Sequence, residues 1–452
     1  MHPWIGAGDH DRRRILDELG LGTVDELFAS VPAEVCVDRL PLPDAEDEAT
    51  VFRHMRSLAE SNVTMGSVPC FLGAGVYRHV QPAVVDAVLS RAEFFTSYTP
   101  YQPEISQGTL QAVFEFQTLM CQLTGMDAAN ASLYDGATAL VEAAHFCHRA
   151  LRGKRSRVVV AETVHPLYRQ VLATYVVAEG LEVVTVPAGG DGRVDADALG
   201  KAVDGTVCGV VVQSPNFLGV VEDLPAAAAA AHGAGALAVH LVAEAVSLGL
   251  LAGGGSLGCD VVCGEAQSFG VPPGFGGPHL GFFACTEQHV RQMPGRLIGQ
   301  TVDADGKRAF CLTLSTREQH IRRAKATSNI CSNQGLMALA ATVWLESIGG
   351  SGLAAMARSC LARTEELKRR IRALGGPWRL AYPSSPTFNE VLVLGPGSGA
   401  ELAQRLADEG VLAGVPSARW GGSWPDGLLV AVTECSSASD LEVLVAAMGR
   451  IS

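Results

Sequence analysis

The sequence contains no apolar run of about 18 to 20 residues, the length that a membrane-spanning helix needs. Its first residues, MHPW at positions 1–4, lack the basic and then apolar pattern of a secretory signal peptide. We therefore expect a soluble, cytoplasmic protein without a membrane partner.

Positive charge is also scarce, because 34 lysine and arginine residues stand against 47 aspartate and glutamate residues, for a formal net charge of -13. Proteins that bind a nucleic-acid backbone concentrate positive charge to displace its counterions. This balance argues against a nucleic acid as partner.

Paired cysteines at metal-site spacing are missing, although the chain has 12 cysteines. Cys259 and Cys263 lie close together, but no second cysteine or histidine pair accompanies them at the spacing of a zinc site. Several cysteines lie in or beside apolar runs, where a free thiol behaves as a small hydrophobic group. We predict reduced cysteines and no metal.

Hydrophobic residues make up 48% of the 452 residues, which is enough for more than one core. Short Val-rich runs alternate with helical stretches, a pattern typical of a mostly parallel sheet covered by helices. The sequence predicts an N-terminal helical arm over residues 1–69, a large α/β domain over 70–345 and a small C-terminal α+β domain over 346–452. The strand-like runs of the large domain are residues 158–160, 182–186, 207–213, 237–242, 260–263 and 280–284.

Two segments are candidate anion sites. YDGATAL, residues 134–140, precedes a predicted helix, whose N-terminal N–H groups favour an anion; the same residues could also be a turn with a helix cap. REQHIRRAKATSNIC, residues 317–331, combines four cations with a Thr-Ser-Asn run. It indicates either a phosphate or carboxylate contact or a solvated basic helix face.

Two further segments are loops of unusual composition. YTPYQPEISQG, residues 98–108, is rich in aromatic, amide and carboxylate groups, and two prolines restrict its backbone. It is either a rigid surface loop or a surface for a ligand or partner. GEAQSFGVPPGFGGP, residues 264–278, follows a predicted strand, where α/β sheets place ligands, but a tight connection between strands explains it equally well.

Together these four segments closely resemble the N-terminal half of the glycine cleavage system P-protein family, which in split form is subunit 1 of glycine dehydrogenase (decarboxylating). The resemblance covers nearly the whole chain, which ends where a fused P-protein would begin its second half. Further matching strings are FLGAG at 71–75, EFQ at 115–117, HPLYR at 165–169, PNFLGVVED at 215–223, MPGR at 293–296 and LVAVTE at 429–434.

The resemblance implies the aspartate-aminotransferase-like fold (fold type I) of enzymes that use pyridoxal phosphate (PLP). Its large α/β domain has a mostly parallel sheet, and a small α+β domain follows. In this family PLP binds glycine, CO2 leaves, and the aminomethyl group passes to the lipoyl arm of the H-protein. Because PLP acts as the electron sink, a lysine must hold and orient it.

By similarity to the His-Lys-Thr pattern of the second subunit, Gln267 stands where the cofactor lysine would be, and glutamine cannot form the covalent bond. None of the chain's lysines follows the strand where this fold places that lysine. The resemblance thus implies no catalytic residue and no covalently bound cofactor on this chain, with PLP on the partner subunit; Lys325 is the one alternative nucleophile to test. The lysines are Lys154, Lys201, Lys307, Lys325 and Lys368.

The resemblance also maps Thr138, His165, Glu244 and Gln267 onto a vestigial PLP pocket. Glu244 lies roughly where this fold uses an aspartate to hold the pyridine nitrogen. Relatives of subunit 1 usually have Asp-Pro where this chain has Glu244 and Ala245. The longer side chain argues further against a cofactor in this pocket.

We then expect this chain to contribute to an active site whose cofactor is bound to another subunit. In many relatives of this fold, a threonine after the lysine segment contacts the phosphate bound to the neighbouring subunit, and Thr327, with Ser328 and Asn329 beside it, resembles that element. The expected partner is the PLP-bearing subunit 2 of glycine decarboxylase, in an α2β2 assembly that also meets lipoylated H-protein. The second candidate for the shared interface is formed by Tyr98, Thr99, Tyr101, Gln102, Glu104, Ser106 and Gln107.

Two other interpretations stay open. The departure at Glu244 and Ala245 allows a pathway-dedicated relative that decarboxylates another small amino acid onto a lipoyl carrier. The chain could instead be a purely structural or regulatory partner, which stabilises subunit 2 without touching its active site.

Overall fold

The computed structural model describes residues 6–37, 39–331 and 334–451. It divides into two compact units, Met1–Val63 and Thr64–Ser452. The boundaries that the sequence suggests after residues 69 and 345 stay predictions.

The first unit is helical. It contains α1 (Asp9–Leu19), two short 3-10 helices and α2 (Glu48–Glu60). Apolar residues recur in α2 at the spacing of one helix face, and all of them are exposed. They are Val51, Phe52, Met55 and Leu58.

The second unit contains a seven-stranded sheet in the order β1-β7-β6-β5-β4-β2-β3. Neighbouring strands from β2 to β6 run parallel, whereas β7 pairs antiparallel with both β6 and β1. The strands are β1 (Ala128–Ala129), β2 (Arg157–Ala161), β3 (Glu182–Val186), β4 (Val207–Gln213), β5 (Leu237–Val242), β6 (Val261–Glu265) and β7 (Gly281–Cys285).

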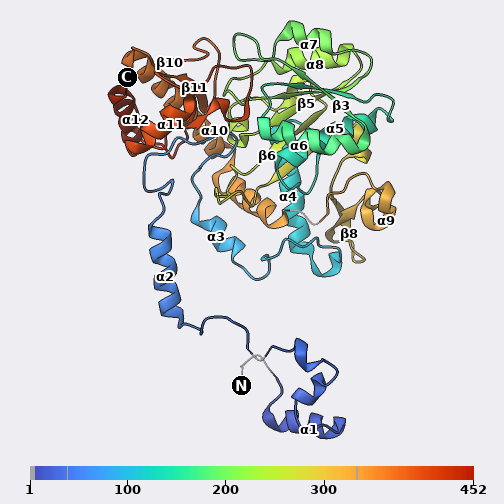
Figure 1. The fold of residues 1–452 in the computed structure, drawn as a ribbon. Helices are drawn as coiled ribbons and strands as arrows, with labels where there is room; N and C mark the ends of the chain where they lie inside the picture. The colour runs from blue at the N-terminus through green and yellow to red at the C-terminus, as the bar shows by residue number, and fades with distance from the viewer. Residues whose placement is uncertain (1–5, 38, 332–333, 452) are drawn as a thin grey trace. The chain divides into compact units, whose positions relative to one another are not determined.

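Burial explains this sheet. Every residue of β4, β5 and β6 is buried, so these strands are covered on both faces and need an apolar side chain at nearly every position. Helices provide the cover: α5 packs against β6 and β7 and lies beside α6, and α8 packs on β4 and β5 (Figure 1). α4 also contacts β1 and β7, and α7 contacts β3. The helices around this sheet are α4 (Gln107–Thr124), α5 (Gly136–Ala150), α6 (Pro166–Val176), α7 (Ala196–Ala202) and α8 (Leu224–Gly233).

The long helix α10 (Gly335–Leu374) links the sheet to the C-terminal part and is interrupted at Gly349, whose φ is 64°. By length and composition alone it could cross a membrane. Its residues Ala338, Ala341 and Trp344 are, however, buried in the hydrophobic core around the large sheet. We therefore assign α10 as a core helix.

A second sheet lies near the C-terminus, in the order β10-β11-β13-β12, with antiparallel neighbours. Its apolar side chains form a core with α10, α11 and α12. The elements are β10 (Arg379–Leu380), β11 (Glu390–Leu394), α11 (Gly399–Asp408), β12 (Val415–Pro416), β13 (Leu428–Ala431) and α12 (Ala438–Arg450). Elsewhere in this unit are α3 (Ala83–Leu89), the hairpin of β8 (Leu297–Val302) and β9 (Arg308–Thr313), and α9 (Gln319–Arg322).

One extended segment, residues 70–81, connects the two sheets, and we call it the strap. At its start, Phe71 N donates to Leu412 O, and Phe71 O accepts a hydrogen bond from Ala431 N. Further along, Tyr77 and His79 bond to residues that follow β6 and β5. The strap therefore crosses the edge at which α/β sheets usually bind their ligands.

Gly219→Ala should strongly destabilise the fold. Gly219 has a φ of +80°, and an added Cβ would lie 1.9 Å from Glu390 O of β11, a backbone atom that cannot rotate away. We expect a loss of unfolding free energy well above about 1 kcal/mol, measured by urea denaturation. Gly200→Ala in α7, where a Cβ meets nothing within 4 Å, is the control and should be neutral or stabilising by up to about 1 kcal/mol. Equal effects of the two variants would contradict this packing.

Candidate functional site

Gln267, at the position expected for the cofactor lysine, is buried just beyond the end of β6. Its side-chain oxygen accepts a hydrogen bond from Tyr77 N at 3.2 Å. Its side-chain nitrogen donates to Tyr77 O at 3.1 Å and to Val271 O at 2.5 Å. The amide is fully bonded within the chain and ties the strap to the loop after β6.

Glu265 is the last residue of β6, and its side chain binds the N-terminus of α5. Its Oε2 accepts a hydrogen bond from Gly136 N, and its Oε1 accepts from Gln267 N and Leu280 N, all at 2.9 Å. His279 Nδ1 lies 3.3 Å from Oε2, and this hydrogen bond raises the pKa of His279. A buried carboxylate of the chain itself thus fills the anion position that the sequence indicates at this helix.

Thr138 serves the same helix as part of its cap. Asp135 Oδ1 accepts a hydrogen bond from Thr138 N at 2.7 Å, and Thr138 Oγ1 accepts one from Asp135 N at 3.2 Å. This reciprocal pair is a capping box. Of the two interpretations left open for residues 134–140, the turn with a helix cap describes this geometry.

His165 is buried between the strap and α6. Its Nδ1 accepts a hydrogen bond from Leu167 N at 3.2 Å, so its proton lies on Nε2, which donates to Ala74 O at 2.8 Å. Its ring stacks on Tyr168, with 4.6 Å between the ring centroids. Burial lowers the pKa of His165 to about 4, so the ring is neutral near pH 7.

His79 of the strap lies between two carboxylates. Its Nε2 is 3.1 Å from Glu244 Oε2, its Nδ1 is 2.8 Å from Glu434 Oε2, and the His79 and Glu244 side chains are each 3% exposed. Burial opposes the charged ring, but the two carboxylates outweigh it and raise the pKa of His79 to about 10. Glu244, expected at the pyridine-nitrogen position, is thus paired with a buried cation of its own chain.

Cys360 extends this cluster, because its Sγ lies 3.3 Å from Glu434 Oε2. Ligand atoms of His79, Cys360 and Glu434 lie within 4.8 Å of one another, a spacing that a metal ion could use. Hydrogen bonds among the three side chains already use several of these atoms. The expectation of no metal stays a prediction.

Arg296 joins the two segments for which the sequence suggests an interface. Its Nη2 donates to the Tyr101 hydroxyl, and its Nη1 donates to Cys331 O at 2.6 Å. Its Nε lies 3.1 Å from Glu318 Oε2 in a largely buried ion pair. Tyr101 also packs edge-on against His320, with 5.6 Å between the ring centroids. We call these five residues the Arg296 cluster.

Thr327 is half-buried, and its N donates to the backbone O of Arg317, the residue before Glu318 of this cluster, at 2.8 Å. The side chains of Ser328 and Asn329 make local hydrogen bonds. Cys331 N donates to the Tyr134 hydroxyl at 3.0 Å. This bond brings the segment to the residues just before α5.

The loop of residues 98–108 is anchored at Tyr101 and at Gln107 and is exposed along much of its length. Gln107 exchanges two hydrogen bonds with the backbone of Phe310, at 2.8 and 2.9 Å. Tyr98 is 68% exposed, whereas Thr99 is buried. The other residues proposed for the interface, Gln102, Glu104 and Ser106, lie at or near the surface.

Comparison with known proteins assigns the family. The model of the glycine cleavage system P-protein matches residues 2–448. The chain belongs to this family. A relative named probable glycine dehydrogenase (decarboxylating) subunit 1, from Anaeromyxobacter dehalogenans, is 54% identical over 428 residues, which are 94% of each chain.

Solved structures agree on the fold. An inhibitor-bound glycine decarboxylase (P-protein) of the glycine cleavage system has a TM-score of 0.90 and 41% identity, covering 99% of this chain and 100% of that chain. A sphingosine-1-phosphate lyase from Burkholderia pseudomallei has a TM-score of 0.65 and 17% identity, covering 92% and 93%; this likeness concerns the fold alone. The fold-type-I architecture of PLP enzymes is confirmed for this P-protein.

The residues that the resemblance maps to the PLP position do not fit a covalently held cofactor. Gln267 has no amine, Glu265 fills the anion position and Glu244 is paired with His79. Lys325, the alternative nucleophile, lies exposed in a short 3-10 helix.

Sequence reasoning missed three residues of this arrangement. Glu265 lies in the glycine-rich segment 264–278, and Arg296 ends the MPGR string at 293–296, but neither residue was predicted to have a role. His79 follows the FLGAG string and received no attention. A histidine four residues after that string was the available signal.

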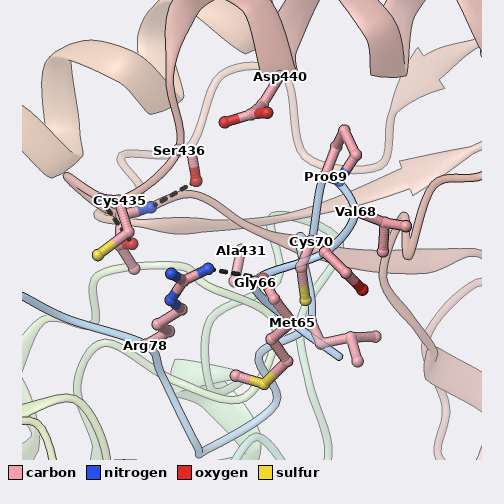
Figure 2. A pocket seen from close by; sticks show the side chains of 13 residues that line it. Met65, Gly66, Val68, Pro69, Cys70, Arg78, Ala431, Cys435, Ser436 and Asp440 are labelled. Atoms are coloured by element: carbon pink, nitrogen blue, oxygen red, sulfur yellow. Dashed lines mark hydrogen bonds between the residues drawn. The ribbon is translucent and has the colours of Figure 1, made fainter. Parts of the chain in front are cut away.

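A pocket of about 330 Å³, which sequence reasoning also missed, lies on the other side of the strap. Arg78 lines it and donates from Nη1 to Met65 O at 2.6 Å (Figure 2). Its neighbours along the strap, Tyr77 and His79, bond to the Gln267 side instead. The pocket is therefore distinct from the PLP position.

Glu390→Gln should flatten the pH dependence of stability between pH 4.5 and about 7. Glu390 accepts hydrogen bonds from Ala74 N at 2.7 Å and the Tyr77 hydroxyl at 2.8 Å, and burial raises its pKa from 4.5 to about 7. Its contribution is complete below pH 4.5 and is lost as pH rises through 7, by up to about 3 kcal/mol. Urea unfolding of both proteins across this range measures the difference, and parallel pH profiles would contradict the assignment.

Proposed function

We propose that this P-protein is subunit 1 of a two-subunit glycine dehydrogenase (decarboxylating) and is active only with a subunit 2 that carries PLP. The complex decarboxylates glycine and transfers the aminomethyl group to the lipoyl group of H-protein. Subunit 2 holds the cofactor, and this chain completes the surroundings of that site.

The observation that carries this proposal is similarity along the whole chain to a relative named as this subunit. The match spans 94% of both chains, so it is more than a shared domain. Gln267 explains why a partner is needed, because an amide nitrogen cannot replace the lysine amine. The word subunit in the relative's name itself implies a second chain.

The Arg296 cluster is our candidate for the shared active site. What supports it is that two segments far apart in the sequence meet there, held by a largely buried Arg296. Thr327 lies beside it, and we propose that its hydroxyl donates to the phosphate of PLP on subunit 2. Ser328 and Asn329 would support the backbone at that contact.

We further propose an α2β2 assembly in the cytoplasm. Large exposed apolar side chains in the loop of residues 98–108 and shortly before it support a protein interface, since exposed apolar patches mark such surfaces. Phe95 is 70% exposed and Ile105 is 79% exposed. Lipoylated H-protein would be a transient partner of the assembled complex.

The relative's name favours glycine over another small amino acid as substrate. A purely structural or regulatory role is the second candidate function. The contacts of Glu265 and Glu244 within the chain agree with both candidates, so the test below is what separates them.

Thr327→Ala in the complex should weaken PLP binding by subunit 2 roughly 10- to 100-fold, because a hydrogen bond to a charged group contributes about 1.5–3 kcal/mol. Titration of the cofactor-free complex with PLP measures this affinity. Thr327→Ser keeps the hydroxyl and is the matched control, which should bind nearly as the parent does.

Unchanged PLP affinity in the Thr327→Ala complex would refute the contact in trans. If Tyr101→Ala also left activity intact, the structural or regulatory role would be favoured. Loss of affinity in the alanine variant alone supports a shared active site.

A further inference from the structure

Two places where the fold would receive PLP, the side chain of Glu244 and the N-terminus of α5, are already engaged by other groups of the chain. We infer that the protein carries internal substitutes for the cofactor: His79 takes the place of the pyridine nitrogen opposite Glu244, and the Glu265 carboxylate takes the place of the phosphate at α5. The strap holds the first substitute in position. This inference concerns the chain alone and does not depend on subunit 2.

The first substitution concerns charge. A buried carboxylate needs a counter-charge, because an unpaired ion in a protein interior costs several kcal/mol. Glu244 is 2% exposed and finds that charge in His79, which Glu434 fixes from its other nitrogen. A pyridine nitrogen could take that place beside Glu244 only if His79 withdrew, which would leave Glu434 without its counter-charge.

The second substitution concerns the helix N-terminus. Glu265 uses three backbone N–H groups, including that of Gly136 in the first turn of α5, and His279 adds a fourth partner. Of these groups, Gly136 N belongs to the N-terminus of α5, where an anion would otherwise bind. A phosphate entering here would meet a carboxylate that is 1% exposed, and the two like charges would repel in a poorly solvated place.

The strap closes the space between the two substitutes. Ala74 O accepts a hydrogen bond from His165 Nε2, Tyr77 is bonded to Gln267, and His79 reaches Glu244. Gly75 lies so close to His165 that an added Cβ would come within 2.7 Å of the ring. The small residues Ala74 and Gly75 of the FLGAG string thus allow the strap to pack directly against His165.

The two substitutes also stabilise the folded state of the chain in the absence of a cofactor. A cofactor that binds only the folded state stabilises it, so a chain that keeps the fold without the cofactor needs other contacts in its place. The charge pair at Glu244 and the filled N-terminus of α5 supply such contacts from within. The chain can then fold and bind a partner without PLP bound to itself.

Titration of the isolated full chain with PLP tests this inference. The parent should show no saturable change in PLP absorbance or fluorescence. The double variant His79→Ala/Glu265→Ala should bind PLP reversibly, at least about tenfold more tightly than the parent. Arg78→Ala, on the opposite side of the strap, is the matched control and should behave as the parent does.

Two outcomes would overturn the inference: a parent that binds PLP as tightly as the double variant, or a folded double variant with no gain in affinity. If the double variant does not fold, a double-mutant cycle with Glu244→Gln and His79→Gln decides. Glu244→Gln should cost clearly less stability in the His79→Gln background than in the parent. Additive losses would show that the two side chains do not act as a pair, and the inference would fall.

Discussion

The ion cluster of Glu244, His79 and Glu434 is the interaction on which the rest of the structure depends. Glu244 follows β5 of the large sheet, His79 belongs to the strap, and Glu434 follows β13 of the small sheet. One buried imidazolium thus joins three parts of the chain that are far apart in sequence. Removing one member of a buried ion pair costs about 3–5 kcal/mol, so the cluster fixes the strap over the large sheet.

The pocket of the large sheet is closed, whereas exposed side chains surround the largely buried Arg296. The chain keeps the fold of PLP enzymes, yet its own side chains satisfy the groups that would hold the cofactor. Arg296 instead orders loops that carry exposed aromatic and aliphatic residues. The same fold can carry its functional site in different places. We propose that in this P-protein the functional site is a surface shared with subunit 2 and not the internal pocket.

The sequence predicted much of the large sheet and less of the site. β4 and β5 have the bounds expected from their continuous apolar runs, since a strand covered on both faces leaves a local pattern. β3, an edge strand that is only partly buried, also has the expected bounds. The position of Gln267 came from similarity. The partners of Glu244 and of Gly136 could not be predicted, because the residues that meet there are 165 and 129 positions apart and no local periodicity links them.

The most direct test compares this chain alone with the same chain purified together with its subunit 2. The measurements are the absorbance of lysine-bound PLP and glycine-dependent CO2 exchange in the presence of lipoylated H-protein. The account predicts both signals from the pair and neither from this chain alone. A lysine-bound PLP band from the isolated chain would contradict the account and direct attention to Lys325.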